Sequence, residues 1–335
     1  MTEPTLSVIL VTEAYSECLR WTLECLAAQS IAPELECILV TRNGSELAGV
    51  TDRLRGVLSH RIIEQETLND SGKAKAAGVW AARAPLVAFV EDHSYPDPLW
   101  AEAMVKAYSR GAFAAVGPVV LNANPATAVS WGCHLVYYGT YMQAGSEGRA
   151  MHLPGNQSSY RKSVLLEYGP RLPDLLQSEI ALHGELIERG MSLHQEAGAK
   201  VYHLNYSRIG PAIREYFLAS RVFAAGRRRR WSLFRRAVYA GGCLVLPFIR
   251  MRRVFGHARQ AALSQRVVAA APWPAWLILC SGAAGEALGY ALGIGGARAA
   301  LMRFEREHAS LFTAADLEQV VRTGPFPLTP VRERG

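Results

Sequence analysis

The 335-residue sequence lacks the motifs of the commonest nucleotide and zinc sites. It contains neither a GxGxxG fingerprint nor a GxxxxGK[ST] loop, so a dinucleotide fold and a P-loop are not indicated. Its six cysteines form no CxxC pair and no Cys/His spacing typical of zinc, and we expect them to be buried thiols in a reducing compartment. The N-terminus has no basic segment followed by a long apolar run, so we expect the body of the protein to face the cytoplasm.

Acidic residues are nearly absent from one stretch of the chain. Residues 208–259 hold 13 arginines, no lysine and a single acid, Glu215, which gives this stretch a charge of +12. The whole chain carries +7, so the remainder carries −5 and a generally basic protein is excluded. Nucleic-acid binding is one interpretation of the arginines. No interleaved aromatic platform accompanies them, so we expect no nucleic-acid partner.

Short apolar runs alternate with helix-length patterns over the first 120 residues. This order predicts an α/β fold with an open, mostly parallel sheet, in which ligands bind at the carboxyl ends of the strands. The expected strands are 6–12, 36–41, 61–64, 86–90 and 113–117, and the expected helices are 16–29, 46–57, 72–83 and 98–110. Further along we expect helices at 177–190 and 208–226 and short strands at 192–195 and 200–203.

Two carboxylates and an imidazole follow the apolar run at 86–90. They are Glu91, Asp92 and His93. Like charges held together favour a divalent cation with oxygen and imidazole ligands. The alternative interpretation is that Glu91 and Asp92 cap the helix that follows.

The C-terminal third is apolar with arginines at its edges. Residues 233–255 form one apolar segment, and residues 273–296 form a second with one charged residue, Glu286. The second segment is long enough to cross a membrane, although Glu286 and six glycines weaken that interpretation. We favour membrane contact, with Trp273 and Trp276 at the interface and the arginines facing anionic lipid, over a helical subdomain that packs on itself.

Over residues 6–226 the order of motifs resembles a bacterial-type family 2 glycosyltransferase of the GT-A fold. The features shared are the first strand, Ser30 after Gln29, an Asn-Gly-Ser turn after the second strand, a Gly-rich helix start at 72–78, and the acidic cluster. The resemblance implies a DxD-type site for a metal, Mn²⁺ or Mg²⁺, and a nucleotide diphosphate at Glu91, Asp92 and His93. His93 stands where the family has a second carboxylate.

The resemblance also implies positions for the nucleotide-sugar donor and the acceptor. His203 would be a further metal ligand, although a structural histidine at a strand end is the alternative. Arg227–Trp231 resembles the family's QxxRW motif without its Gln, and we interpret it as the basic edge of a membrane-facing segment. The donor positions fall on Thr12, Glu13, Arg42, Asn43 and Lys73 or Lys75, together with Glu91 and Asp92, and the loop near donor sugar and acceptor falls on Gly155 and Asn156.

The family's general base falls on Glu179. Its spacing to Leu182 and Leu186 places this carboxylate on the inner face of the helix, in the first turn. Ser178 replaces the carboxylate that usually precedes the base, and Asp174 is a nearby substitute. The alternative is a first-turn glutamate that only interacts with the helix dipole.

These observations lead to one hypothesis and a rival. The hypothesis is a metal-dependent, inverting glycosyltransferase on the cytoplasmic face of the cell membrane, which moves a sugar from a nucleotide-diphosphate sugar to a glycan or lipid-linked acceptor. Its expected domains are a GT-A domain at 1–230, a membrane-associated helical region at 231–310 and a C-terminal helix and tail at 311–335. The rival, motivated by Ser178 and His93, is an inactive GT-A-like module that serves as a membrane-bound assembly partner.

Overall fold

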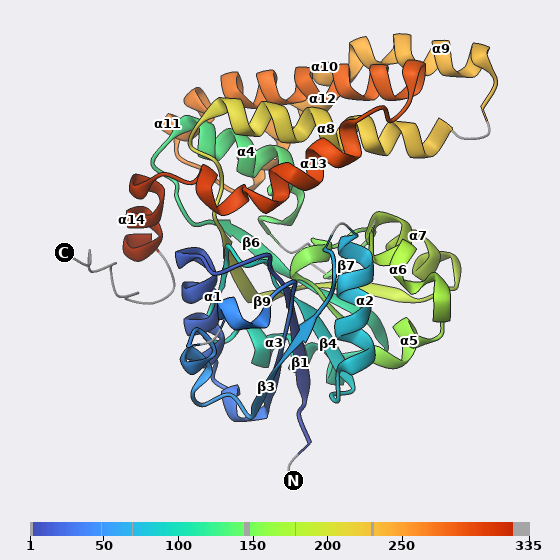
Figure 1. Ribbon diagram of the computed structural model, residues 1–335. Helices are drawn as coiled ribbons and strands as arrows, with labels where there is room; N and C mark the ends of the chain where they lie inside the picture. The colour runs from blue at the N-terminus through green and yellow to red at the C-terminus, as the bar shows by residue number, and fades with distance from the viewer. Residues whose placement is uncertain are drawn as a thin grey trace. The chain divides into compact units, whose positions relative to one another are not determined.

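The computed structural model describes residues 3–47, 49–68, 70–143, 148–177, 179–228 and 231–323 (Figure 1). These residues form two compact units. Unit 1 comprises the chain up to Leu121, Gln143–His203 and the segment that begins at Val321, and unit 2 comprises Asn122–Met142 and Leu204–Val320. The division differs from the expected boundaries at 230 and 310. Ser178, Arg229, Arg230 and the expected tail beyond 323 lie outside the described residues.

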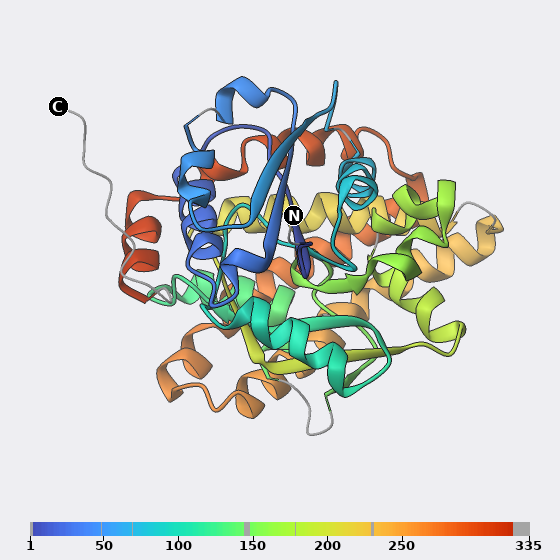
Figure 2. The same cartoon turned by 90° about the horizontal axis from the view of Figure 1, so that it is seen from below.

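One half of the sheet of unit 1 is the predicted parallel α/β arrangement. Its strands lie in the order β3-β2-β1-β4, and every neighbouring pair is parallel. Strands β1 and β2 are almost wholly buried, as expected for apolar strands covered on both faces. Helices α1 and α2 lie on opposite sides of these strands (Figure 2). The bounds are β1 (Leu6–Val11), α1 (Glu17–Ala27), β2 (Leu35–Thr41), β3 (Ser59–Glu64), α2 (Ser71–Ala81) and β4 (Leu86–Phe89).

The other half of the sheet contains antiparallel pairs and continues in the order β8-β6-β9-β5. Strand β8 runs antiparallel to both β4 and β6, and β9 runs antiparallel to β5 and β7. The two short strands expected at 192–195 and 200–203 are parts of the single strand β9. The bounds are β5 (Ser94–Pro96), β6 (Phe113–Asn122), β7 (Arg149–Ala150), β8 (Ser159–Arg161) and β9 (Ser192–His203).

The helix expected at 46–57 does not form. Two 3₁₀ turns, η2 (Gly44–Leu47) and η3 (Thr51–Leu54), occupy this region. Gly49 between them and Gly56 after them have φ values of 82° and 104°, which a continuous right-handed helix does not contain. The remaining helices of unit 1 are α3 (Trp100–Arg110), α5 (Lys162–Leu166), α6 (Leu172–Leu176) and α7 (Glu179–Glu188).

Unit 2 is helical. The apolar segment at 233–255 is not one helix, because η8 (Cys243–Val245) separates α9 from α10 and Pro247, in the first turn of α10, has no backbone N–H to continue a helix from the preceding residues. The helices are α4 (Ala128–Tyr138), α8 (Ile209–Arg227), α9 (Leu233–Gly242), α10 (Leu246–Gln260), α11 (Gln265–Ala270), α12 (Pro272–Leu292), α13 (Ala297–Arg306) and α14 (Ala314–Thr323).

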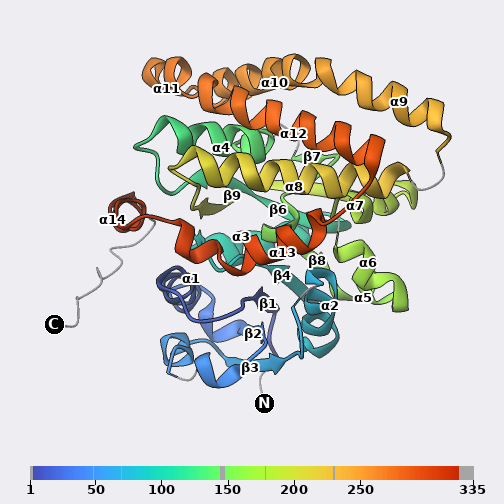
Figure 3. The ribbon, with the colours of Figure 1, turned by 45° about the horizontal axis from the view of Figure 1, so that its top comes forward.

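Glycines on α12 allow close packing against α8. A Cβ on Gly285 would lie 2.2 Å from the Phe217 carbonyl oxygen, and one on Gly289 would lie 2.6 Å from the Arg221 carbonyl oxygen. Helix α12 lies between α8 and the α9–α10 segment (Figure 3). Among the described helices, it is the one long and apolar enough to cross a membrane, and half of its apolar window is buried. Because a core helix has the same composition, this is weak evidence for membrane association.

A buried histidine of α7 makes the stability of unit 1 depend on pH. The His183 ring is fully buried, with Nε2 2.9 Å from the Tyr160 hydroxyl, and burial lowers its pKa to about 4. As pH falls from 6.5 toward 4, the unfolded chain gains a proton that the folded chain does not, so unfolding becomes easier. We expect about 2 kcal/mol of unfolding free energy to be lost between pH 7.5 and 5, measured by urea denaturation.

The same denaturation series on variants assigns the effect. In His183→Gln the loss of about 2 kcal/mol of unfolding free energy between pH 7.5 and 5 should disappear. His60 in β3 is exposed, so His60→Gln serves as the control and keeps the wild-type slope. A slope that is unchanged in His183→Gln contradicts the assignment.

Candidate active site

Strand pairing brings two histidines from distant parts of the chain together. Strand β4 ends at Phe89, and the chain turns through Glu91 and His93 into β5. In the β5–β9 ladder, Ser94 lies opposite His203, so the last residue of β9 is placed beside His93. Pro96 is tolerated in β5 because this strand lies at the end of the sheet. The register therefore completes a cluster at the carboxyl end of β4.

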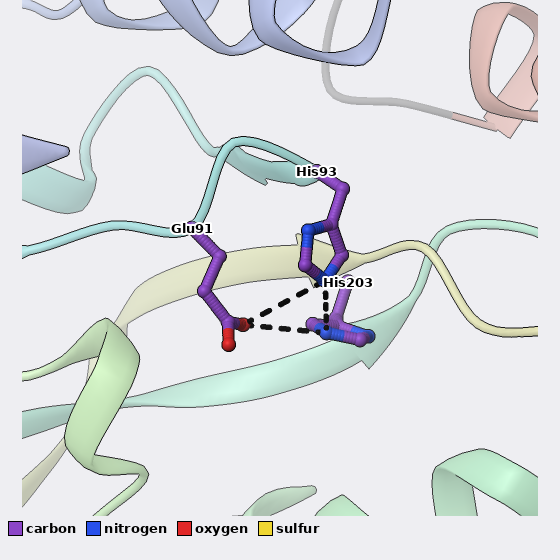
Figure 4. A group of neighbouring side chains, drawn as sticks. All are labelled: Glu91, His93 and His203. Atoms are coloured by element: carbon purple, nitrogen blue, oxygen red, sulfur yellow. Dashed lines mark hydrogen bonds and ion pairs between the residues drawn. The ribbon is translucent and has the colours of Figure 1, made fainter. Parts of the chain in front are cut away.

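Glu91, His93 and His203 direct three potential ligand atoms toward one point (Figure 4). The two Nε2 atoms of the histidines are 3.1 Å apart, and Glu91 Oε2 lies 3.3 Å from His203 Nε2 and 4.0 Å from His93 Nε2. Neighbouring ligands about 2.1 Å from one cation are separated by roughly 3.0 to 3.4 Å. Two of the three separations lie in this range and the third, at 4.0 Å, is wider, so the cluster suits a divalent cation held by one carboxylate and two imidazoles.

Asp92 is turned away from this cluster and contacts the other side of His93. Its carboxylate lies 3.0 Å from His93 Nδ1 and accepts a hydrogen bond of 2.9 Å from the Thr12 hydroxyl. A carboxylate on Nδ1 favours the proton there and leaves the Nε2 lone pair for a metal. In this geometry His203, and not the expected Asp92, is the third potential ligand of the cluster, and Asp92 contacts His93 from its other side.

Two amide side chains hold Glu91 in place. Asn156 Nδ2 donates to Oε1 at 2.7 Å, and Gln157 Nε2 donates to Oε2 at 2.6 Å. Burial raises the pKa of Glu91, but hydrogen bonding from His203 and the nearby imidazoles outweigh it, so the pKa lies below its ordinary value. Gln157 was not among the predicted site residues, and its position directly after Gly155 and Asn156 was the signal available in the sequence.

Lys75 connects the cluster to Glu179. Its ammonium group donates to Asn156 Oδ1 at 2.5 Å and forms an ion pair with the Glu179 carboxylate. The exposed fractions of the two side chains are only 12% and 20%. Leu182 and Leu186 are fully buried, as their spacing predicted. Glu179, Lys75, Asn156 and Glu91 thus form one chain of polar contacts within unit 1.

The other residues predicted to contact the donor or to assist the base are more exposed to solvent. Arg42, Asn43, Lys73 and Asp174 are exposed, while Glu13 is half-buried. The Asn43 side chain accepts from the Ser45 backbone amide and stabilises the turn after β2. Lys73 and Asp174 do not belong to the chain of contacts described above. The lysine of α2 that faces the cluster is Lys75.

Gly155 gives Glu179 room beside the loop. This glycine begins η5 (Gly155–Gln157), and a Cβ on it would lie 2.1 Å from Glu179 Cγ. We expect Gly155→Ala to displace the Glu179 side chain and lower turnover at least tenfold, because small misplacements of reacting groups are costly. Steady-state assays with a saturating donor check this, with circular dichroism to show an intact fold.

Gly184 is the matched control for that substitution. It lies on α7, and nothing approaches within 4 Å of the Cβ it would gain. Gly184→Ala should keep wild-type turnover. Equal turnover in both alanine variants contradicts the packing of Glu179 against the loop.

The fold and the cluster together define a GT-A-like α/β domain. Residues 7–169 match the sequence profile of Glycosyl transferase family 2. This part of the chain is therefore a family 2 glycosyltransferase domain.

A solved structure of GalNAc-T7 with UDP, GalNAc and Mn²⁺ is similar to this chain at 14% sequence identity and a TM-score of 0.46. The similarity covers 59% of this chain and 43% of that one, so the chain spans less than half the length of that protein. A comparison with curated proteins gave no match.

Proposed function

We propose that the protein is a metal-dependent, inverting glycosyltransferase that uses a nucleotide-diphosphate sugar. The observation that carries the proposal is the chain of contacts from Glu179 through Lys75 and Asn156 to Glu91. At one end is a carboxylate in the first turn of α7, and at the other is a cluster suited to Mn²⁺ or Mg²⁺. A base and a diphosphate site are the two parts that this reaction needs.

Glu179 is the proposed base. It accepts the proton of the acceptor hydroxyl as that oxygen bonds to the anomeric carbon, while the bond from this carbon to the diphosphate breaks on the opposite ring face. Lys75 fixes the carboxylate by its ion pair, and Gly155 leaves the space beside it. Attack opposite the leaving group inverts the anomeric centre.

The cluster at the end of β4 is the proposed site of the leaving diphosphate. Glu91, His93 and His203 would hold the metal, which supplies positive charge to the departing diphosphate. Asp92 keeps His93 in the ligating tautomer, and Thr12 holds Asp92. Glu13, Arg42 and Asn43 remain the proposed contacts of the nucleoside, near the ends of β1 and β2.

A panel of nucleotide-diphosphate sugars tests the function. The full chain is incubated with each donor, an acceptor extract and Mn²⁺ or Mg²⁺, and release of the nucleoside diphosphate is measured. One donor should support metal-dependent release, and the product should have the opposite anomeric configuration. Binding of nucleotide without transfer from any donor would instead support the inactive assembly partner.

The acceptor is proposed to be a lipid-linked or surface glycan precursor, with unit 2 contacting the cytoplasmic face of the membrane. Helices α9 and α10 and the turn between them expose large apolar side chains, including Leu233, Phe234 and Phe248, beside exposed arginines. Apolar surface next to positive charge is typical of proteins that bind an anionic membrane surface. Comparison of transfer to lipid-linked and water-soluble forms of one glycan tests this part.

A further inference from the structure

Unit 2 contains a cavity that the proposed transfer reaction does not use. It has a volume of about 460 Å³, is open toward solvent and is lined by residues of α8, α9, η8, α10 and α12. Apolar side chains, including Phe223, Val238 and Leu246, form much of its lining. Three charged side chains also line it, namely Arg227, Arg250 and Glu286. A cavity of this size accommodates part of a small molecule.

The charges in the lining are not balanced. Arg250 and Glu286 form an ion pair of 2.6 Å, and Glu286 is buried. Glu286 is the one carboxylate among the described lining residues. The Arg227 guanidinium donates to the Tyr290 hydroxyl at 3.0 Å and lies 5.6 Å from the centre of the Trp231 ring. The lining therefore carries a net positive charge.

A second arginine shares the aromatic rings that Arg227 contacts. Arg235 lies 4.4 Å from the centre of the Trp231 ring and 5.7 Å from that of Tyr239, and Arg227 lies 5.9 Å from Tyr239. Within the described residues, no carboxylate forms an ion pair with either arginine. Two guanidinium groups that share these rings repel each other, so an anion that contacts them reduces the repulsion.

Neighbouring arginines are engaged elsewhere. Arg228 donates to the carbonyl oxygens of Tyr290 and Ala291 at the end of α12, and Arg236 donates to that of Trp231. Among the described residues, no backbone carbonyl oxygen accepts a hydrogen bond from the guanidinium groups of Arg227 and Arg235, which thus combine positive charge with available donors. A phosphate offers the several acceptor oxygens that such donors require.

The surroundings of the cavity distinguish a lipid from a soluble phosphate. Leu244 and Phe248, on η8 and α10, are 79% and 62% exposed, and Val238 both lines the cavity and is half exposed. A soluble anion makes no use of an exposed apolar surface, whereas the hydrocarbon of a lipid does.

We propose that this cavity binds the phosphate group of a membrane lipid. The phosphate contacts Arg227 and Arg235, and the adjoining hydrocarbon lies along Val238 and Leu246 toward the exposed apolar side chains of η8 and α10. This inference does not depend on the proposed sugar transfer, because the cavity belongs wholly to unit 2. It assigns the unit a lipid-specific site in addition to general attraction to an anionic surface.

Vesicle co-sedimentation of the full chain tests the proposal. Phosphatidylcholine vesicles containing phosphatidic acid are compared with vesicles in which oleate supplies the same surface charge. The wild type should bind the phosphatidic acid vesicles at least tenfold more tightly. Equal affinity for the two kinds of vesicle overturns the proposal in favour of attraction to surface charge. An affinity for inorganic phosphate equal to that for the phosphatidic acid vesicles overturns it in favour of a soluble ligand.

Matched variants locate the site. Arg227→Gln should weaken binding to phosphatidic acid vesicles at least tenfold, because it removes a charged donor from the cavity. Arg252 on α10 is exposed and does not line the cavity, so Arg252→Gln makes the same charge change and should weaken binding roughly fivefold or less. Equal losses in the two variants contradict a site at the cavity.

A third variant keeps the charge and fills the space. Val238→Trp places a large side chain at the cavity lining while leaving Arg227 and its contact with Tyr290 in place. It should also weaken binding at least tenfold, with an unchanged melting temperature. Wild-type affinity in Val238→Trp overturns the proposal even if Arg227→Gln fails to fold.

Discussion

Replacing Glu179 by glutamine should reduce turnover by roughly 10² to 10⁴, because a general base contributes about that factor. The amide has nearly the same shape, so the packing of the side chain against Gly155 is retained. It cannot accept the acceptor's proton, and it loses the charge of the ion pair with Lys75. The change is measured as kcat with saturating donor and acceptor, with the KM of the donor determined in parallel.

A control on the same helix separates the base from general effects of charge. Glu185 on α7 forms an ion pair with Arg171 at 2.5 Å on the surface. Glu185→Gln makes the same chemical change and should leave turnover within about twofold of the wild type, since surface pairs contribute little. Wild-type turnover in a folded Glu179→Gln enzyme would exclude Glu179 as the base.

Removing His203 should weaken binding of the divalent cation by a factor of about 10² or more. Ligand-orienting contacts alone account for about 10- to 100-fold, and His203 is itself a proposed ligand. His203→Ala should therefore lose most activity at low Mn²⁺ and recover part of it as Mn²⁺ is raised. Electron paramagnetic resonance measures the concentration of free Mn²⁺, and subtraction from the total gives the amount of bound Mn²⁺.

Asp92 and His60 provide the comparison for this variant. Asp92 contacts His93 from outside the cluster, so Asp92→Asn should weaken Mn²⁺ binding less than His203→Ala does. His60 is exposed on β3, and His60→Ala should bind Mn²⁺ as the wild type does. If His203→Ala binds Mn²⁺ with wild-type affinity, the cation is held by other residues.

In the parallel half of the sheet, β1, β2 and β4 could be predicted because each is a short, largely apolar run that the sequence displays locally. Strand β5 could not, because Ser94, Tyr95 and Pro96 have no strand-like alternation and pair only when β9 is present. The region at 46–57 was wrongly predicted as a helix because its apolar spacing was read without the positive φ values at Gly49 and Gly56. The local sequence pattern was therefore sufficient to predict a strand only where the strand forms without depending on a distant partner such as β9.

The residues of the candidate site likewise divide into those that the local sequence could predict and those that depend on contacts between distant parts of the chain. Glu91, His93 and Glu179 could be selected from their positions after a strand and at a helix start. Whether Asp92 or His203 lies beside Glu91 and His93 in the cluster depends on how β9 is aligned with β5, which no local pattern contains. Lys75 was one of two candidate lysines, and only the packing of α2 distinguishes it from the exposed Lys73.

The alignment of β5 with β9 also joins cation binding to folding. His93 and His203 are 110 residues apart in the chain, so the three-ligand cluster exists only after β9 has paired. An unfolded chain has no such cluster, and a cation that binds the folded form shifts the folding equilibrium toward it. At a free concentration 100 times the dissociation constant, this shift is about 2.7 kcal/mol. A cation bound by the cluster would then also stabilise the pairing of β5 with β9 that brings its ligands together.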